Sequence, residues 1–181
     1  MQYHAHALAS SGVDVDMVGY EGAPLPKSLT SDPHITVHRL VEPRMRHSAR
    51  QRSKIVFGFL ATIDAVRASF RLGLALLRIP KPDLLLVQNP PSIPTLQVSW
   101  LAARLRGARL VIDWHNLGYT LLRPRLGPSH PAVRLARWLE RRDARRDEAN
   151  LCVSRGLAAF LESRFGVTNA HVLYDRPASA F

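Results

Sequence analysis

The chain has 181 residues, 46% of them hydrophobic, which is enough for one folded domain with a buried core and argues against global disorder. The formal net charge of +11 indicates an anionic partner: a phosphorylated substrate, an acidic membrane surface or a nucleic acid. The single cysteine, Cys152, excludes an intramolecular disulfide.

Short apolar runs alternate with longer segments of helical periodicity. This pattern is typical of βαβ units and of a Rossmann-like parallel sheet with helices on both faces. From the amino terminus, the sequence predicts a helix over 2–12, a strand over 13–20, a loop rich in proline and glycine over 21–34, and a strand over 35–40. We expect the whole chain, 1–181, to form one α/β domain.

A long amphipathic helix is predicted over 55–78. The charged residues within it, including Asp64 and Arg71, argue against a membrane-spanning helix. Its buried face is expected to consist of the apolar residues at helical spacing: Val56, Leu60, Ile63, Val66, Phe70, Leu74 and Leu77.

The carboxyl-terminal part continues the alternation, with strands expected over 83–89, 108–114, 150–154 and 170–177 and helices over 94–106, 130–148 and 155–165. Within 134–148 the sequence carries six arginines and four acids, so we expect a solvated helix face with i,i+4 ion pairs. Leu135 and Trp138 are expected to face inward.

Polar residues follow four of the predicted strands, in QNPP (88–91), DWHN (113–116), VS (153–154) and YDRP (174–177). Ligands of open parallel sheets bind beyond the carboxyl ends of the strands. Asp113 and His115 lie two residues apart at such an end, so both side chains can project toward one cleft. Either one of them is a catalytic base or orients a substrate, or Asp113 caps the next turn and His115 is an interior histidine.

The neighbours of this pair also allow two readings. Trp114 is expected to pack in the core or under the loop that follows the strand. Asn116 binds either a sugar hydroxyl or its own turn. Gln88 and Asn89 either contact a sugar or belong to a stiff connector, because two prolines follow them directly.

The sequence argues against a metal site and against nucleic-acid binding. His4 and His6 fall on different sides of a helix, and the chain has no cysteine cluster. The arginines are not interleaved with aromatic residues in any nucleic-acid-binding motif.

Six motifs occur in order along the chain: MQYHA, LLVQNPPSIPTL, LVIDWHNLGY, GPSHP, NLCVS and VLYDRPASAF. Together they resemble the amino-terminal domain of the chitobiosyldiphosphodolichol β-mannosyltransferases over nearly the whole chain. The resemblance implies a two-domain GT-B fold without a bound metal or other cofactor. It also implies transfer of mannose, with inversion, from GDP-mannose to dolichol-diphosphate-linked chitobiose at the cytosolic face of the endoplasmic reticulum membrane.

The resemblance also implies roles for single residues. Asp113 and His115 become the catalytic candidates, one of them as the base. Residues expected to contact substrate are His4, Gln88, Asn89, Asn116, Tyr174 and Asp175. The implied partners, besides the lipid-linked sugar, are the membrane surface and other mannosyltransferases of the dolichol pathway.

A basic run precedes the long helix and contains Arg44, Arg46, Arg50, Arg52 and Lys54. A basic segment beside an apolar helix fits an interfacial membrane element, which would suit a lipid-linked substrate. The alternative is a solvated loop that leads into an ordinary core helix.

The sequence departs from the family pattern at both ends. In the family, a first strand and a Gly/Ser loop precede the segment matching MQYHA, and a nucleotide-binding domain follows the segment that ends here at Phe181. That first strand is central in a doubly wound sheet, so without it we expect two exposed strand edges. Because a GT-B site lies between two domains, we expect no measurable transfer by the isolated chain. The alternative function is a non-catalytic module that binds a full-length enzyme.

Overall fold

The computed structural model describes residues 1–22, 24–41, 54–146 and 148–175. They divide into two compact units, Met1–Pro80 and Lys81–Phe181, which are described separately. The basic residues Arg44, Arg46, Arg50 and Arg52 lie outside the described residues. The prediction that the whole chain forms one domain stays a prediction.

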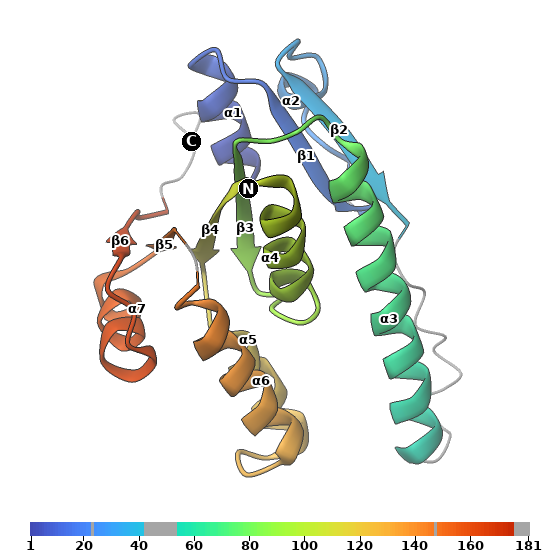
Figure 1. Cartoon of the computed structure of the whole chain (residues 1–181), viewed down its shortest axis with the longest axis vertical. Helices are drawn as coiled ribbons and strands as arrows, with labels where there is room; N and C mark the ends of the chain where they lie inside the picture. The colour runs from blue at the N-terminus through green and yellow to red at the C-terminus, as the bar shows by residue number, and fades with distance from the viewer. Residues whose placement is uncertain (23, 42–53, 147, 176–181) are drawn as a thin grey trace. The chain divides into compact units, whose positions relative to one another are not determined.

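The amino-terminal unit contains α1 (Gln2–Ser10), β1 (Val15–Tyr20), α2 (Lys27–Thr30), β2 (Ile35–Leu40) and α3 (Lys54–Arg78) (Figure 1). β1 and β2 are parallel, with Val15 opposite Ile35. Ala5 and Ala9 of α1 pack with Leu29 and Ile35 in a small core. Between α1 and β1 the chain turns at Gly12, whose φ of 77° is a conformation that glycine adopts without strain.

Two predictions for this unit are wrong in detail. The segment 21–34 is not only loop, because residues after Pro26 form the single helical turn α2, which buries Leu29. In α3 the predicted buried face includes Val66, Phe70 and Leu77, yet these are 63%, 71% and 50% exposed.

The buried face of α3 consists instead of Ala68, Leu72 and Leu76, spaced four residues apart, at 6–8% exposure. Apolar residues occur around most of this helix, so its periodicity is compatible with two faces, and packing against β2 selects one. No helix in the described part of the chain is long and apolar enough to cross a membrane.

The carboxyl-terminal unit contains β3 (Leu84–Asn89), α4 (Thr95–Arg106), β4 (Arg109–Trp114), α5 (Gly118–Leu126), α6 (Pro131–Asp143), β5 (Ala149–Cys152), α7 (Arg155–Phe160), the π-helical turn η2 (Leu161–Phe165) and β6 (Ala170–Val172). All four strands are parallel, in the order β3-β4-β5-β6. α4 packs on β3 and β4, and α7 packs on β5 and β6 (Figure 1).

The Rossmann-like α/β class is confirmed, with parallel strands and helices in alternation. Among the described residues the strands form two sheets, and β1 and β3 each pair with a single strand. The predicted last strand, 170–177, is wrong in length, because β6 ends at Val172 and only Leu173 still donates to the Cys152 carbonyl. The helix α5 was not predicted, and its internal Pro124 disfavours a helix when the sequence is considered alone.

Trp114 lies at the centre of the core of this unit and is fully buried. Its ring meets Phe165 edge to face, with centroids 6.4 Å apart, and Phe165 meets Phe160 in the same way at 5.5 Å. The core position predicted for Trp114 is confirmed. This core holds the end of β4, where the candidate site begins.

Candidate active site

At the carboxyl end of β4, His115 lies between two carboxylates. Its Nε2 is 2.8 Å from Oδ2 of Asp113, and its Nδ1 is 3.3 Å from Oδ2 of Asp175. The Asp113 side chain is 3% exposed, whereas the His115 and Asp175 side chains are 26% and 69% exposed. Exposure therefore increases from the buried Asp113 through His115 to Asp175.

The alternation of side chains along β4 produces this arrangement. Trp114 points into the core, where its Nε1–H donates to Oδ1 of Asn150 at 2.6 Å. Asn150 is itself held because its amide donates to the Ala144 carbonyl and to Oδ1 of Asn169. With Trp114 directed inward, Asp113 and His115 project to the opposite side of the strand.

Asn89 holds the loop that carries His115. Its backbone carbonyl accepts from the amide of His115 at 2.9 Å, and its fully buried side chain donates to the Asn116 carbonyl at 3.0 Å. Oδ1 of Asn116 accepts from the Leu117 amide at 2.8 Å, so this side chain binds its own turn. Both asparagines thus have structural partners, and their contact with substrate stays a prediction.

The other predicted site residues lie at several places. Gln88 is half-buried on β3, in register with Asp113. Tyr174 is 52% exposed and directly precedes Asp175. His4 is on α1 in the amino-terminal unit, and Lys54 is the first residue of α3. In the described ranges no group of three or more histidine, cysteine or acidic residues is placed to hold a metal ion.

Glu140 of α6 is a site-shaping residue that sequence reasoning missed. It is fully buried, and its Oε1 accepts from the Tyr119 amide at 2.9 Å, at the start of α5. A Cβ atom added to Gly118 would come within 2.5 Å of Ser92 Oγ and 2.7 Å of Glu140 Oε1, so this position requires glycine. The contact joins α6 to the turn that follows His115.

The burial of Glu140 also corrects the prediction that the charged residues of α6 form a solvated face with i,i+4 ion pairs. Val133, Ala136, Glu140 and Asp143 are all buried at helical spacing, so two acids lie on the inward face. In the sequence, Glu140 and Asp143 lie at helical spacing from the apolar Val133, and this spacing could have predicted that both acids are buried. The ion pair described on this helix joins the adjacent residues Arg142 and Asp143 at 2.8 Å, rather than residues four apart.

Burial raises the pKa of Glu140 from 4.5 to about 7, against the opposing effect of its hydrogen bonds. The folded state therefore retains a proton that the unfolded chain releases. We expect the free energy of unfolding to fall by about 3 kcal/mol as the pH rises from about 4.5 to about 7. Denaturant titrations at several pH values measure this.

The variant Glu140→Gln isolates the effect because it keeps an acceptor for Tyr119 and cannot ionise. Its stability should match the wild type at low pH and exceed it above pH 7. Glu162→Gln, at an exposed position of η2, is the matched control and should follow the wild type. Parallel pH profiles for the wild type and Glu140→Gln would contradict this assignment.

Comparison with known proteins decides the family. The model of the glycosyl transferase 4-like domain matches residues 1–174. The chain belongs to the glycosyl transferase 4-like family. The resemblance seen in the six sequence motifs is thereby confirmed, and the fold agrees with the amino-terminal half of a GT-B glycosyltransferase.

Several relatives match this glycosyltransferase chain along its whole length. Among them are the UDP-glycosyltransferase TURAN of Arabidopsis thaliana, 38% identical, and the chitobiosyldiphosphodolichol beta-mannosyltransferases of Mus musculus and Homo sapiens, 33% and 34% identical. The chain spans only 36–38% of the length of these curated relatives. By family it is a glycosyltransferase domain.

Proposed function

We propose that this chain is the acceptor-binding part of an inverting β-1,4-mannosyltransferase. The enzyme would transfer mannose from GDP-mannose to GlcNAc2-diphosphodolichol, for protein N-glycosylation, at the cytosolic face of the endoplasmic reticulum membrane. The names of the mouse and human relatives support the substrate class. The contact of His115 with the buried Asp113 is the single observation that carries the catalytic part of the proposal.

The proposed step is a single displacement. The acceptor hydroxyl oxygen bonds to the anomeric carbon of mannose while the bond from that carbon to the diphosphate oxygen breaks, and GDP leaves with the electron pair. The hydroxyl proton needs a base within hydrogen-bond reach. Asp113 holds Nε2–H of His115, which leaves Nδ1 as the nitrogen that accepts this proton.

Asp175 has a separate part in this proposal. Its carboxylate faces Nδ1 at 3.3 Å and is well exposed, so it can move aside for the acceptor. After proton transfer the imidazolium lies between two carboxylates, which stabilises its charge. Gln88 and Tyr174, beside Asp113 and Asp175 respectively, would contact the acceptor sugar.

The remaining predicted contacts belong to the proposal as well. His4 would contact the acceptor, and the basic run with Lys54 would contact an anionic membrane surface. Other dolichol-pathway mannosyltransferases would be partners at that surface. The donor would be bound mainly outside the 181 residues of this chain.

A fusion tests the proposed function, in which this chain replaces the matching segment of the mouse relative. We expect the fusion to transfer mannose in the β configuration from GDP-mannose to a chitobiosyl-diphosphate lipid with a shortened chain. UDP-sugars are the control donors, because the Arabidopsis relative carries a UDP-glycosyltransferase name. Transfer from a UDP-sugar in place of GDP-mannose, or none from a folded fusion, would refute the proposal.

The unfused chain provides a second measurement. We expect it to bind the same acceptor lipid and to show no transfer from GDP-mannose, because the donor and acceptor are not held together. Calorimetric titration with the acceptor lipid and radiolabelled transfer assays measure the two properties. Binding by the chain combined with an inactive fusion would favour the non-catalytic module instead.

A further inference from the structure

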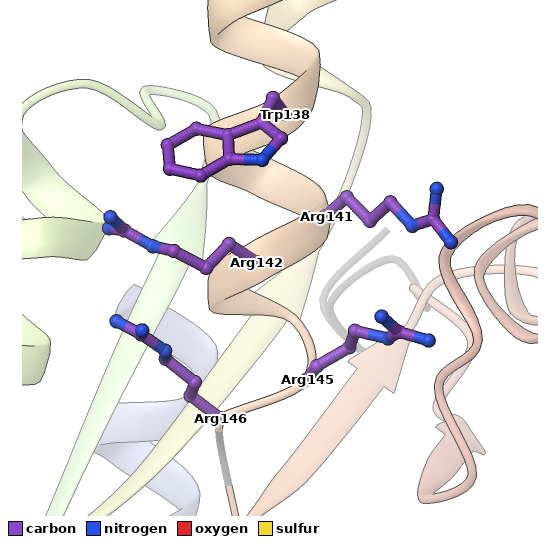
Figure 2. A pocket seen from close by; sticks show the side chains of 5 residues that line it. All are labelled: Trp138, Arg141, Arg142, Arg145 and Arg146. Atoms are coloured by element: carbon purple, nitrogen blue, oxygen red, sulfur yellow. The ribbon is translucent and has the colours of Figure 1, made fainter.

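Five side chains line a hollow of about 340 Å³ at the carboxyl-terminal end of α6: Trp138, Arg141, Arg142, Arg145 and Arg146 (Figure 2). We call this hollow the arginine pocket. None of its residues belongs to the cluster of Asp113, His115 and Asp175. The predicted inward position of Trp138 and Leu135 is wrong, because both are 56% exposed.

The arginine pocket has a strong excess of positive charge. The two acids of this stretch of α6, Glu140 and Asp143, are turned into the interior at 0% and 1% exposure. Arg142 forms an ion pair with Asp143 at 2.8 Å. In the described part of the chain, Arg142 is the one arginine of the pocket with an ion pair, and Arg141, Arg145 and Arg146 are exposed.

Two indole rings hold guanidinium groups in place. Arg142 lies over the ring of Trp138 with its Cζ 5.3 Å from the centroid, and Arg146 lies over Trp100 at 5.0 Å. Trp138, Arg142 and Arg146 point to one side of α6, and Arg141 and Arg145 point to the other (Figure 2). A ring contact uses the face of a guanidinium, so the N–H groups of Arg146 remain in the plane to bind an anion. In Arg142, Nε and Nη2 already donate to Oδ1 of Asp143.

We propose that the arginine pocket binds a phosphate-bearing anion, either a diphosphate or a phosphate monoester. The four arginines that line the hollow lie two on each side of α6, and only Arg142 has an ion pair among the described residues. The remaining like charges repel one another, and an anion of more than one charge relieves that repulsion. The planar guanidinium fork matches phosphate oxygens with two parallel hydrogen bonds. This chemistry occurs in soluble phosphate esters and in the headgroups of anionic phospholipids.

The first arm of the test uses inorganic pyrophosphate and the full chain at low salt. We expect saturable binding that changes tryptophan fluorescence, because Trp100 and Trp138 each contact a pocket arginine. The double variant R145Q/R146Q should bind about tenfold more weakly or worse, since a charged hydrogen bond contributes about 1.5–3 kcal/mol. Both of its arginines are exposed, and circular dichroism melting checks that the fold is kept.

The matched control is R155Q/R164Q, which removes the same charge from exposed positions of α7 and η2. It should change pyrophosphate affinity by less than about twofold, a margin that long-range charge effects allow. Equal losses in the two double variants would overturn the proposal, because binding would then follow net charge alone. Absence of binding by the folded wild type to both this probe and the vesicles below would also overturn it.

The second arm distinguishes the source of the phosphate. Phosphatidylcholine vesicles with one part in five of phosphatidic acid are compared with pure phosphatidylcholine vesicles in a sedimentation assay. Binding to the acidic vesicles that R145Q/R146Q loses and R155Q/R164Q keeps identifies a lipid headgroup. Pyrophosphate binding without vesicle binding identifies a soluble ligand. Either result can be obtained whether or not the fusion transfers mannose, so this inference and the proposed function fail separately.

Discussion

Replacing His115 with alanine in the fused enzyme should lower transfer from GDP-mannose by about 10²- to 10⁴-fold, the usual contribution of a positioned general base. The imidazole is the group through which the buried Asp113 and the exposed Asp175 are connected. Initial rates at saturating donor and acceptor measure the loss.

The order of effects among three variants identifies the base. Asp113→Asn keeps an oxygen that accepts from Nε2–H but loses the charge that stabilises the imidazolium, so its rate should fall by about 10²-fold or more. Asp175→Asn should have a much smaller effect, because this side chain is 69% exposed and solvent screens its charge. If Asp175→Asn is the most damaging variant and His115→Ala is nearly normal, Asp175 is the base.

A control is available on β6, which is separated from β4 by β5. His171 lies on β6 and is exposed, and no ion pair among the described residues joins it to the cluster, so His171→Ala removes a comparable histidine of the same unit. Its transfer rate should equal that of the unchanged fusion. Unfolding curves for each variant separate a loss of chemistry from a loss of fold.

Trp114→Ala should lower the free energy of unfolding by about 3–5 kcal/mol, the range for removal of a large side chain from a well-packed core. The indole is fully buried and contacts Phe165 edge to face. The change also leaves Oδ1 of Asn150 without its 2.6 Å donor. Denaturant titration followed by circular dichroism measures the loss.

Trp138→Ala is the matched control, because this second tryptophan is 56% exposed on α6. Its stability should change by no more than about 0.5 kcal/mol. A double-mutant cycle of Trp114→Phe with Asn150→Ala isolates the hydrogen bond, for which we expect a coupling of about 1 kcal/mol. Equal destabilisation by Trp114→Ala and Trp138→Ala would contradict the core position of Trp114.

The position of Trp114 also links stability to the site. It separates Asp113 from His115 in the chain, and its orientation places both neighbours on the opposite side of β4. A variant that loosens this residue should therefore reduce transfer even where the chain remains folded. Trp114→Phe, which retains most of the core contact, is expected to lose less activity than Trp114→Ala.

The amino-acid sequence alone was enough to predict the α/β class and the polar end of β4. Alternation of apolar runs with helical segments is a local property, and it identified most helices and strands within a few residues. The rule that ligands bind beyond strand ends placed Asp113 and His115 together, because they are only two residues apart. The family resemblance also rested on short ordered motifs, which the match over residues 1–174 confirms.

Only the tertiary structure decided which apolar face of α3 is buried, because Phe70 and Leu72 lie on different sides of a helix that is apolar on both. It also placed Glu140 beside Tyr119 and brought Asp175 to His115, across 21 and 60 residues of sequence. Such contacts depend on how helices and strands pack, whereas periodicity reports only neighbours within a few turns. The clustering of arginines around Trp138 has the same origin, because buried acids on α6 leave its outer surface to the basic residues.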